Sequence, residues 1–185
     1  MKQKILLFAV VLMSFNFVAC VDTAKGKSNR DVWLMPDSTI SQQLGASLTN
    51  VLFSPKKVRC YHLIRKKDIT DKDVQPIKGY VRDSLLAVFT DKQTAVLQYL
   101  LLANNKSYSE DIISIEAPYV PVIEFEFVDK KKRVASVIIS LSDRSWTIMY
   151  DEKEQFNYNY TDVRLLERFC NLFLDGYYNA KKTNK

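Results

Sequence analysis

The first stripe of apolar residues beyond the N-terminal region predicts a helix. Its members recur every three or four positions, as in an amphipathic helix: Ile40, Leu44, Leu48 and Val51. The side chain of Asp37 or Ser38 is suited to cap the first turn, and Pro55 is expected to stop the helix.

A strand and a second helix are predicted next. Residues 58–64 (VRCYHLI) have the composition of a strand, and residues 80–89 fit either a strand or a short helix. Thr90 and Gln93 have the spacing of a capping box, which predicts a helix through residues 95–103. This segment is apolar on more than one side, so we expect it to be buried.

Four short stretches of alternating apolar and polar residues predict an antiparallel meander. Charged or polar turns separate these stretches, which lie at 123–127, 135–141, 146–150 and 156–160. Glu124 and Glu126 alternate with apolar residues, so we expect one face of the sheet to be buried and the other to be wet. The last two strands should be direct neighbours, because a turn of five residues, 151–155, joins them.

A final helix closes the predicted domain. Thr161 is suited to cap it, and its inner face carries Val163, Leu166, Cys170 and Phe173. Gly176 stands where a helix C-terminus favours glycine, so residues 177–185 are expected to form a frayed basic tail. The element order predicts an α+β fold: an antiparallel sheet, including the C-terminal four-strand meander, with about three helices packed on one face.

Composition and the N-terminal segment add a targeting signal to this picture. Of the 185 residues, 47% are hydrophobic, which argues against disorder. Residues 5–18 form an apolar run interrupted only by Ser14 and Asn16, typical of a signal peptide and too short for a transmembrane helix. Removal of residues 1–19 takes away two of the 27 basic residues and none of the 21 acidic ones, leaving a net charge of +4. This mild excess predicts no nucleic acid partner.

The apolar run ends in residues 17–20 (FVAC), which resemble the lipobox of bacterial lipoproteins. Ala19 supplies the small residue that precedes the cut in that family, while Phe17 replaces the usual leucine. The resemblance implies that residues 1–19 are a signal peptide and that Cys20 carries a diacylglycerol and an amide-linked acyl chain. The protein would then be held to a membrane outside the cytoplasm. An ordinary secretory signal or an uncleaved anchor helix is the alternative interpretation.

The segment after the lipobox predicts a tether and then a single domain. Residues 20–36 are expected to be the lipid-anchored tether, because residues 21–30 are polar, small and without apolar periodicity. Val21 offers no acidic signal for retention in the inner membrane, so the outer membrane is favoured. Residues 37–176 are long enough to build one hydrophobic core, and we expect one domain there.

Two further resemblances concern the source of the chain and its fold. The triplets Asp22-Thr23-Ala24, Asp37-Ser38-Thr39 and Asp83-Ser84-Leu85 resemble the O-glycosylation pattern of Bacteroidetes exported proteins. The stretch 90–174, in which Ser107-Tyr108 lies between a Leu-rich helix and a meander, resembles small bacterial exported proteins. The second resemblance implies a fold and no activity.

Cysteine and histidine residues are the candidates for chemistry. With lipid on Cys20, Cys60 and Cys170 form an even pair in an oxidising compartment, so they are either a disulfide or two buried apolar residues. Cys60 and His62 share one face of the predicted strand, as a thiolate–imidazole pair would. The sequence shows no third orienting group and no metal-ligand spacing. We therefore predict no catalytic residue, metal or cofactor.

Aromatic residues crowd the last two predicted strands. They are the best candidate binding surface in the sequence, for a sugar ring or an apolar patch of a partner: Trp146, Tyr150, Phe156, Tyr158 and Tyr160. The alternative, which we expect, is burial under the final helix through Leu166, Phe169 and Phe173. The basic run 130–133 would suit anionic headgroups, but it is more simply a solvated hairpin turn.

These features predict an envelope-anchored lipoprotein whose domain is a non-enzymatic binding or assembly module. Its partners would be the membrane, through lipid on Cys20, and an envelope protein or glycan. Two alternatives stay open. One is a hydrolase that uses Cys60 and His62. The other is an inhibitor or immunity lipoprotein that acts through a protruding loop, either residues 68–75 or the Lys130 turn.

Overall fold

The computed structural model of the chain describes residues 35–108, 118–151, 153–160 and 163–183, which belong to one compact unit, 33–185. The predicted signal peptide (1–19), the lipidation site Cys20 and all but the last two residues of the predicted tether (20–36) lie outside the described residues. The domain that follows is therefore the part of the chain whose structure bears on function.

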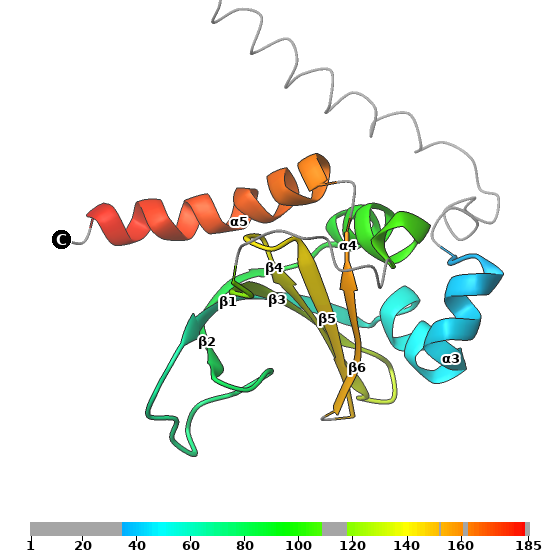
Figure 1. The fold of residues 1–185 in the computed structure, drawn as a ribbon, viewed down its shortest axis with the longest axis horizontal. Coiled ribbons are helices and arrows are strands. Elements are labelled where there is room, and N and C mark those ends of the chain that lie inside the picture. The colour runs from blue at the N-terminus through cyan, green and yellow to red at the C-terminus, as the bar shows by residue number, and fades with distance from the viewer. Residues whose placement is uncertain (1–34, 109–117, 152, 161–162, 184–185) are drawn as a thin grey trace, which may run out of the picture. The chain divides into compact units, whose positions relative to one another are not determined.

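The described residues form three α-helices and six strands. The helices are α3 (Ser38–Phe53), α4 (Asp91–Leu97) and α5 (Val163–Thr183), with two short helices, η2 (Gln98–Leu102) and η3 (Asn105–Ser107), after α4. The strands are β1 (Lys57–Arg65), β2 (Tyr80–Val88), β3 (Pro121–Val128), β4 (Val134–Ser140), β5 (Ser145–Tyr150) and β6 (Lys153–Asn159). They make one antiparallel sheet in the order β2-β1-β3-β4-β5-β6 (Figure 1). The predicted α+β class and the C-terminal four-strand meander are confirmed.

Local signals in the sequence start α3 and α4 where they were predicted to start, while Thr161, the predicted cap of the final helix, lies outside the described residues. The Asp37 carboxylate caps α3 by accepting a hydrogen bond of 2.9 Å from the Ile40 backbone N–H. The capping box of α4 is present, with Thr90 and Gln93 each bonding the other's backbone. The helix predicted over 95–103 is one α-helix followed by the π-helical turn η2.

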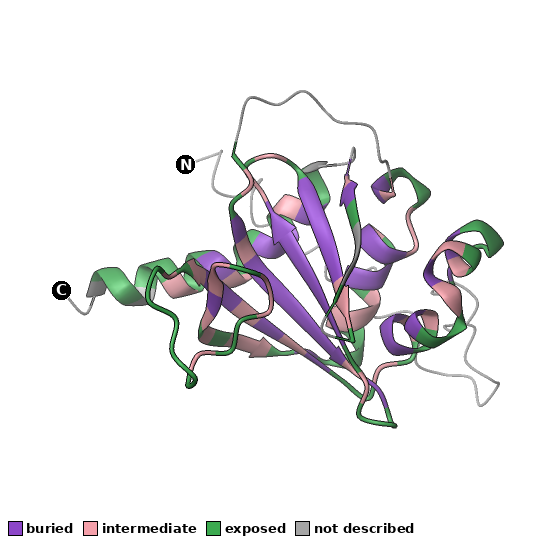
Figure 2. Ribbon diagram, turned by 60° about the horizontal axis from the view of Figure 1, so that its bottom comes forward, coloured by how far each residue is buried: buried purple, intermediate pink, exposed green. Residues whose placement is uncertain are grey.

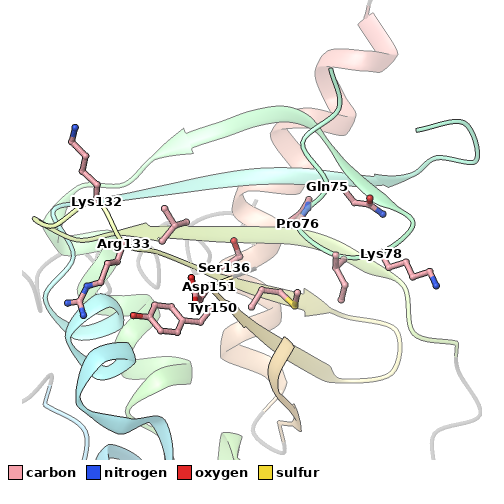
Figure 3. Close-up of a pocket in the computed structure, with 11 residues that line it drawn as sticks. Gln75, Pro76, Lys78, Lys132, Arg133, Ser136, Tyr150 and Asp151 are labelled. Carbon is pink, nitrogen blue, oxygen red and sulfur yellow. The ribbon is translucent and has the colours of Figure 1, made fainter. Parts of the chain in front are cut away.

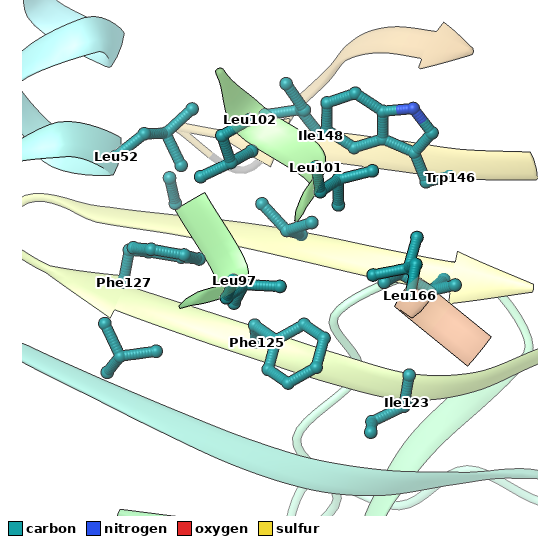
Figure 4. Close-up of a cluster of buried hydrophobic side chains, with 14 of the residues drawn as sticks. Leu52, Leu97, Leu101, Leu102, Ile123, Phe125, Phe127, Trp146, Ile148 and Leu166 are labelled. Atoms are coloured by element: carbon teal, nitrogen blue, oxygen red, sulfur yellow. The ribbon is translucent and has the colours of Figure 1, made fainter. Parts of the chain in front are cut away.

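The helices cover one face of the sheet, and the core lies between the two layers (Figures 1 and 4). The helical layer contributes Leu52, Leu97, Leu101, Leu102 and Leu166 among others, and the sheet contributes Ile123, Phe125, Phe127 and Ile148. Buried residues run along the central strands in Figure 2. The opposite face of the sheet carries no helix among the described residues, and we call it the helix-free face.

The predicted aromatic cluster is mostly buried rather than an open surface. Trp146, Tyr158 and Tyr160 are at most 2% exposed, and Tyr150 is half-buried, while the side chain of Phe156 lies outside the described residues. Burial was the expected outcome, but the predicted cover is wrong in part. Tyr108 packs edge-on against Trp146 and Tyr158, whereas Phe169 and Phe173 of α5 pack on Phe89 at the other side of the core.

We expect replacement of Trp146 by alanine to lower the free energy of unfolding by about 3–5 kcal/mol, the range for large-to-small changes of a buried aromatic residue. The indole is fully buried, and its Nε1–H donates a 2.6 Å hydrogen bond to the Ser107 carbonyl oxygen. The variant therefore leaves a cavity and an unpaired carbonyl. Urea unfolding measures the loss, and Trp146→Phe, which keeps most of the volume, should lose less. Equal stability of the alanine variant and the native chain would contradict this packing.

The C-terminal tail departs from its prediction. Helix α5 does not end at Gly176 but continues to Thr183, so the expected frayed tail 177–185 is wrong over residues 177–183. Contacts with β2 explain the difference. The Tyr177 hydroxyl donates to the Asp83 carboxylate, and the Lys181 ammonium lies 3.5 Å from the same carboxylate. Tertiary contacts therefore extend the helix beyond its glycine.

Candidate functional site

The helix-free face of the sheet is the first feature that bears on function, and the sequence prediction for it was wrong. Glu124 and Glu126 were expected on a wet face, but they are 0% and 6% exposed. Ser136 and Ser140 of the neighbouring strand are buried as well. The reason is that arginines of β1 and β2 reach across this face and pair with both carboxylates, which makes their burial possible.

We call Arg59, Arg82, Glu124 and Glu126 the arginine–glutamate network. Arg82 binds Glu124 in a fork, with Nε 2.7 Å from Oε2 and Nη2 2.6 Å from Oε1. Its Nη1 lies 2.9 Å from Glu126, and Arg59 donates to the other oxygen of Glu126. Ser136 of β4 donates a 2.6 Å hydrogen bond to Glu124. The network thus joins four neighbouring strands.

The charges of this network balance, which makes it a structural element rather than a vacant ion site. Burial opposes the charge of Arg82, but the hydrogen bonds that it donates to Glu124 and Glu126, and its attraction to these carboxylates, outweigh burial and raise its pKa. The Tyr61 ring lies 4.3 Å from the guanidinium carbon of Arg82 and covers it from one side. Arg82 therefore stays charged, and the network covers part of the helix-free face with paired polar groups.

A pocket of about 920 Å³ opens on the helix-free face beside this network (Figure 3). We call it the sheet-face pocket. Its walls are the β1–β2 connection, through residues 75–78, and the facing ends of β4 and β5, through residues 132–134, Ser136 and residues 149–151. Its size falls within the range of about 300–1,000 Å³ that is typical of ligand pockets.

The β4–β5 wall of the sheet-face pocket is held in place by helix α3. Arg133 pairs with Asp129 at 2.6 Å and also donates to the Ser47 hydroxyl. The Tyr150 hydroxyl lies 2.8 Å from the same Ser47 hydroxyl. The hydrogen bonds that Asp129 accepts from Arg133 and from backbone N–H groups outweigh burial and lower its pKa, so the pair is charged at neutral pH. The wall is therefore preorganised.

The chemistry of the sheet-face pocket is mixed, as a ligand site requires. Val134 and Met149 give apolar surface, Ser136 gives a hydroxyl group, and Lys78 and Lys132 lie at opposite ends (Figure 3). Among the described residues that line the pocket, Lys78, Lys132 and Arg133 outnumber one carboxylate, Asp151. Such a pocket can hold a ligand with an apolar surface and hydroxyl or anionic groups.

A second polar cluster lies on the helical side of the sheet, around the only histidine of the chain. His62 is 5% exposed and stacks on the Tyr177 ring, with 4.1 Å between ring centres. Its Nδ1 lies 3.5 Å from the Asp83 carboxylate, and its Nε2 lies 3.4 Å from the Tyr178 hydroxyl. Lys181 reaches the same carboxylate. These contacts hold the last turns of α5 against β1 and β2.

Protonation of His62 at acid pH should weaken the contacts between α5 and the sheet and so lower the stability of the fold. Burial, partly offset by Asp83, lowers the pKa of His62 below its ordinary 6.5. The unfolded chain then binds the proton more tightly than the folded one. The stability that neutral His62 contributes is fully present above the ordinary pKa of 6.5, and it is lost as the pH falls towards and through the lower pKa of the folded state. We expect the unfolding free energy to drop from about pH 7 to about pH 5, in the titration range of histidine. His62→Gln should flatten this part of the curve in urea titrations, and an unchanged drop would refute the assignment.

Cys60 and Cys170 are both buried free thiols in the structure, so the disulfide that was one interpretation is not formed there. Burial, followed by interaction with Cys170, raises the pKa of Cys60 and keeps it protonated. A nucleophilic cysteine needs the opposite shift. Cys60 and His62 share one face, as predicted, but Cys60 belongs to the apolar core and His62 to the Asp83 cluster.

Among the described residues, no group of three or more His, Cys, Asp and Glu side chains is arranged to hold a metal ion. None of the helices in that part of the chain is long and apolar enough to cross a membrane.

Of the aromatic side chains that the sequence proposed as a binding surface and that the structure describes, Tyr150 alone lines the sheet-face pocket. The basic run contributes Lys132 and Arg133 to the pocket, a role that the sequence analysis missed. The remaining wall, residues 75–78, could not be placed there from the sequence, because its position depends on the fold of the β1–β2 connection.

Comparison of the chain with protein families, with curated proteins and with solved structures found no match.

Proposed function

We propose that the protein is a bacterial envelope lipoprotein whose α+β domain is a non-enzymatic binding or assembly module, with its ligand site in the sheet-face pocket. Lipid on Cys20 would hold it to a membrane, with the outer membrane favoured. The ligand is an envelope glycan or a protruding part of an envelope protein. The anchor is supported by the lipobox resemblance of residues 17–20.

One observation carries the binding role: a preorganised pocket of about 920 Å³ on the helix-free face. Ser136 of the pocket donates a hydrogen bond to Glu124 of the arginine–glutamate network, and Arg133 and Tyr150 of the pocket wall are hydrogen-bonded to Ser47 of α3. Rigid, partly apolar hollows with a few placed polar groups are the usual form of ligand sites. The buried, protonated state of Cys60 gives the hydrolase alternative no such support.

Site-specific photo-crosslinking in the native host tests this proposal. A benzophenone amino acid replaces Val134 in the pocket or Val88 outside it; both are partly exposed strand valines, at 42% and 50%. We expect an adduct from position 134 and none from position 88. Equal adducts from both positions, or none from position 134, would refute the pocket as the ligand site.

An inhibitor or immunity lipoprotein is the second candidate, and the exposed β1–β2 connection favours it. Residues 67–72 are all exposed. Asp73 orders the base of this loop through Lys66 at 2.7 Å and through Thr70, and these hydrogen bonds lower its pKa to about 2. A crosslinker at Asp71 separates the two candidates, because an adduct at 71 without one at 134 would favour the inhibitor.

A further inference from the structure

Helix α5 presents two leucines to solvent on the side that faces away from the sheet. Its inner side is buried in the core through Leu166, Cys170 and Leu174. Leu165 and Leu172 are 53% and 73% exposed, and they are seven residues apart, so they lie on one side of the helix. We call this side the outer face of α5.

Cations flank the exposed leucines. Arg164 and Arg168 precede Leu172 on the same side, and Lys182 follows it; all three cations are exposed. Among the described residues of this side, they outnumber one exposed carboxylate, that of Asp175. Within the described part of the chain, no salt bridge engages any of the three cations. The outer face therefore combines isolated apolar side chains with unneutralised positive charge.

We propose that the outer face of α5 rests on a membrane surface that bears anionic lipid headgroups. Leucines between basic residues are the pattern of helices that lie in the membrane interface, where apolar side chains enter the headgroup region and cations attract anionic lipid. A protein partner fits less well, because two separate leucines do not make the continuous patch that a stable interface buries. The occupant is thus a lipid surface.

The inference rests on the proposed lipid anchor in one respect, since the anchor places the domain beside a membrane. The 17 residues 20–36 span at most about 60 Å when extended, so the domain stays within reach of the bilayer. The helices and the sheet-face pocket lie on opposite faces of the sheet (Figures 1 and 3). Docking through α5 therefore turns the pocket away from the membrane, towards a partner.

Vesicle sedimentation of the compact unit, residues 33–185, tests the surface without the lipid. This unit contains the entire described sheet and core, so it can fold without the N-terminal segment. Vesicles of phosphatidylcholine with phosphatidylglycerol are compared with vesicles of phosphatidylcholine alone. We expect binding to the anionic vesicles, and reversal of two cations by Arg164→Glu and Arg168→Glu should weaken it about tenfold or more.

The matched control reverses two exposed lysines of the basic turn, Lys130→Glu and Lys131→Glu, which changes the net charge by the same amount. It should weaken binding less than about twofold if α5 is the docking face. Equal weakening by both double variants, or equal binding to both kinds of vesicle, would overturn the proposal. Thermal unfolding of each variant shows whether it is folded.

A second measurement does not depend on the charge variants. An environment-sensitive dye is attached to a cysteine at position 172 or, as control, at position 88, while the buried Cys60 and Cys170 stay unlabelled. Anionic vesicles should shift the emission of the dye at position 172 to the blue and leave that at position 88 unchanged. A shift at 88 alone, or at neither position, would refute docking through α5. Because the unit lacks Cys20, these results stand apart from any failure of the lipid anchor.

Discussion

Replacement of Cys20 by alanine is expected to abolish stable membrane attachment of the protein. The lipobox resemblance of residues 17–20 implies that this cysteine would carry the acyl chains. Each buried methylene contributes about 0.8 kcal/mol, so two or three chains hold a protein firmly and none leaves only the weak surface attraction of the domain. The variant should move from the membrane fraction to the soluble fraction or accumulate as precursor, and it should lose the label of a radioactive fatty acid.

The matched control is Cys60→Ala, which removes a different cysteine that is buried in the core. Its partition and its fatty-acid label should equal those of the native protein. Membrane attachment and label that persist in Cys20→Ala would show that another residue or segment holds the protein. An uncleaved anchor helix would be indicated by persistent attachment with no label in either variant.

Replacement of Arg82 by methionine should cost about 3–5 kcal/mol of unfolding free energy, the range for breaking a buried ion pair from one side. Arg82 binds both Glu124 and Glu126, which are 0% and 6% exposed. The variant leaves Glu124 without its arginine in a buried place, which is the main source of the loss. Chemical unfolding by urea gives the value.

Two further variants separate the network from general effects of losing an arginine. Arg65→Met removes an exposed arginine of β1, and we expect a change within about 0.5 kcal/mol. Adding Glu124→Gln to Arg82→Met removes the uncompensated charge and should restore a large part of the stability. A loss below about 1 kcal/mol in Arg82→Met would mean that the network is not a structural element.

Elements whose signals are local in sequence were predictable. Asp37 and the capping box of Thr90 and Gln93 depend on residues three positions apart, and they start α3 and α4 as expected. The meander follows from alternation within each strand and from its short turns. The last hairpin is tighter than predicted, since β6 already begins at Lys153.

Features that depend on distant contacts were not predictable. The burial of Glu124 and Glu126 requires Arg82, which is 42 residues away from Glu124 in the sequence. Alternation alone assigns such glutamates to solvent, because charged side chains are seldom buried unless paired. The helix was predicted to end at Gly176, but contacts of α5 with Asp83 of β2 stabilise its continuation beyond this glycine.

The candidate site shows the same division. The aromatic cluster could be found in the sequence, and its burial could be expected from its apolar character. The sheet-face pocket could not be found in this way. Its two walls, residues 75–78 on one side and residues 132–134, 136 and 149–151 on the other, meet only when the β1–β2 connection folds over the helix-free face. Prediction of such a pocket would require the order of the strands in the sheet, which cannot be read from the pattern of residues along the chain.

The central claim, that this domain is lipid-anchored through Cys20, is tested most directly by the mass of the N-terminal peptide of the mature protein. The protein is purified from membranes, digested and analysed by mass spectrometry. The account predicts that the chain begins at Cys20 and that this residue carries the mass of a diacylglycerol and an acyl chain. An unmodified N-terminus at any residue, or a chain that still begins at Met1, would contradict it.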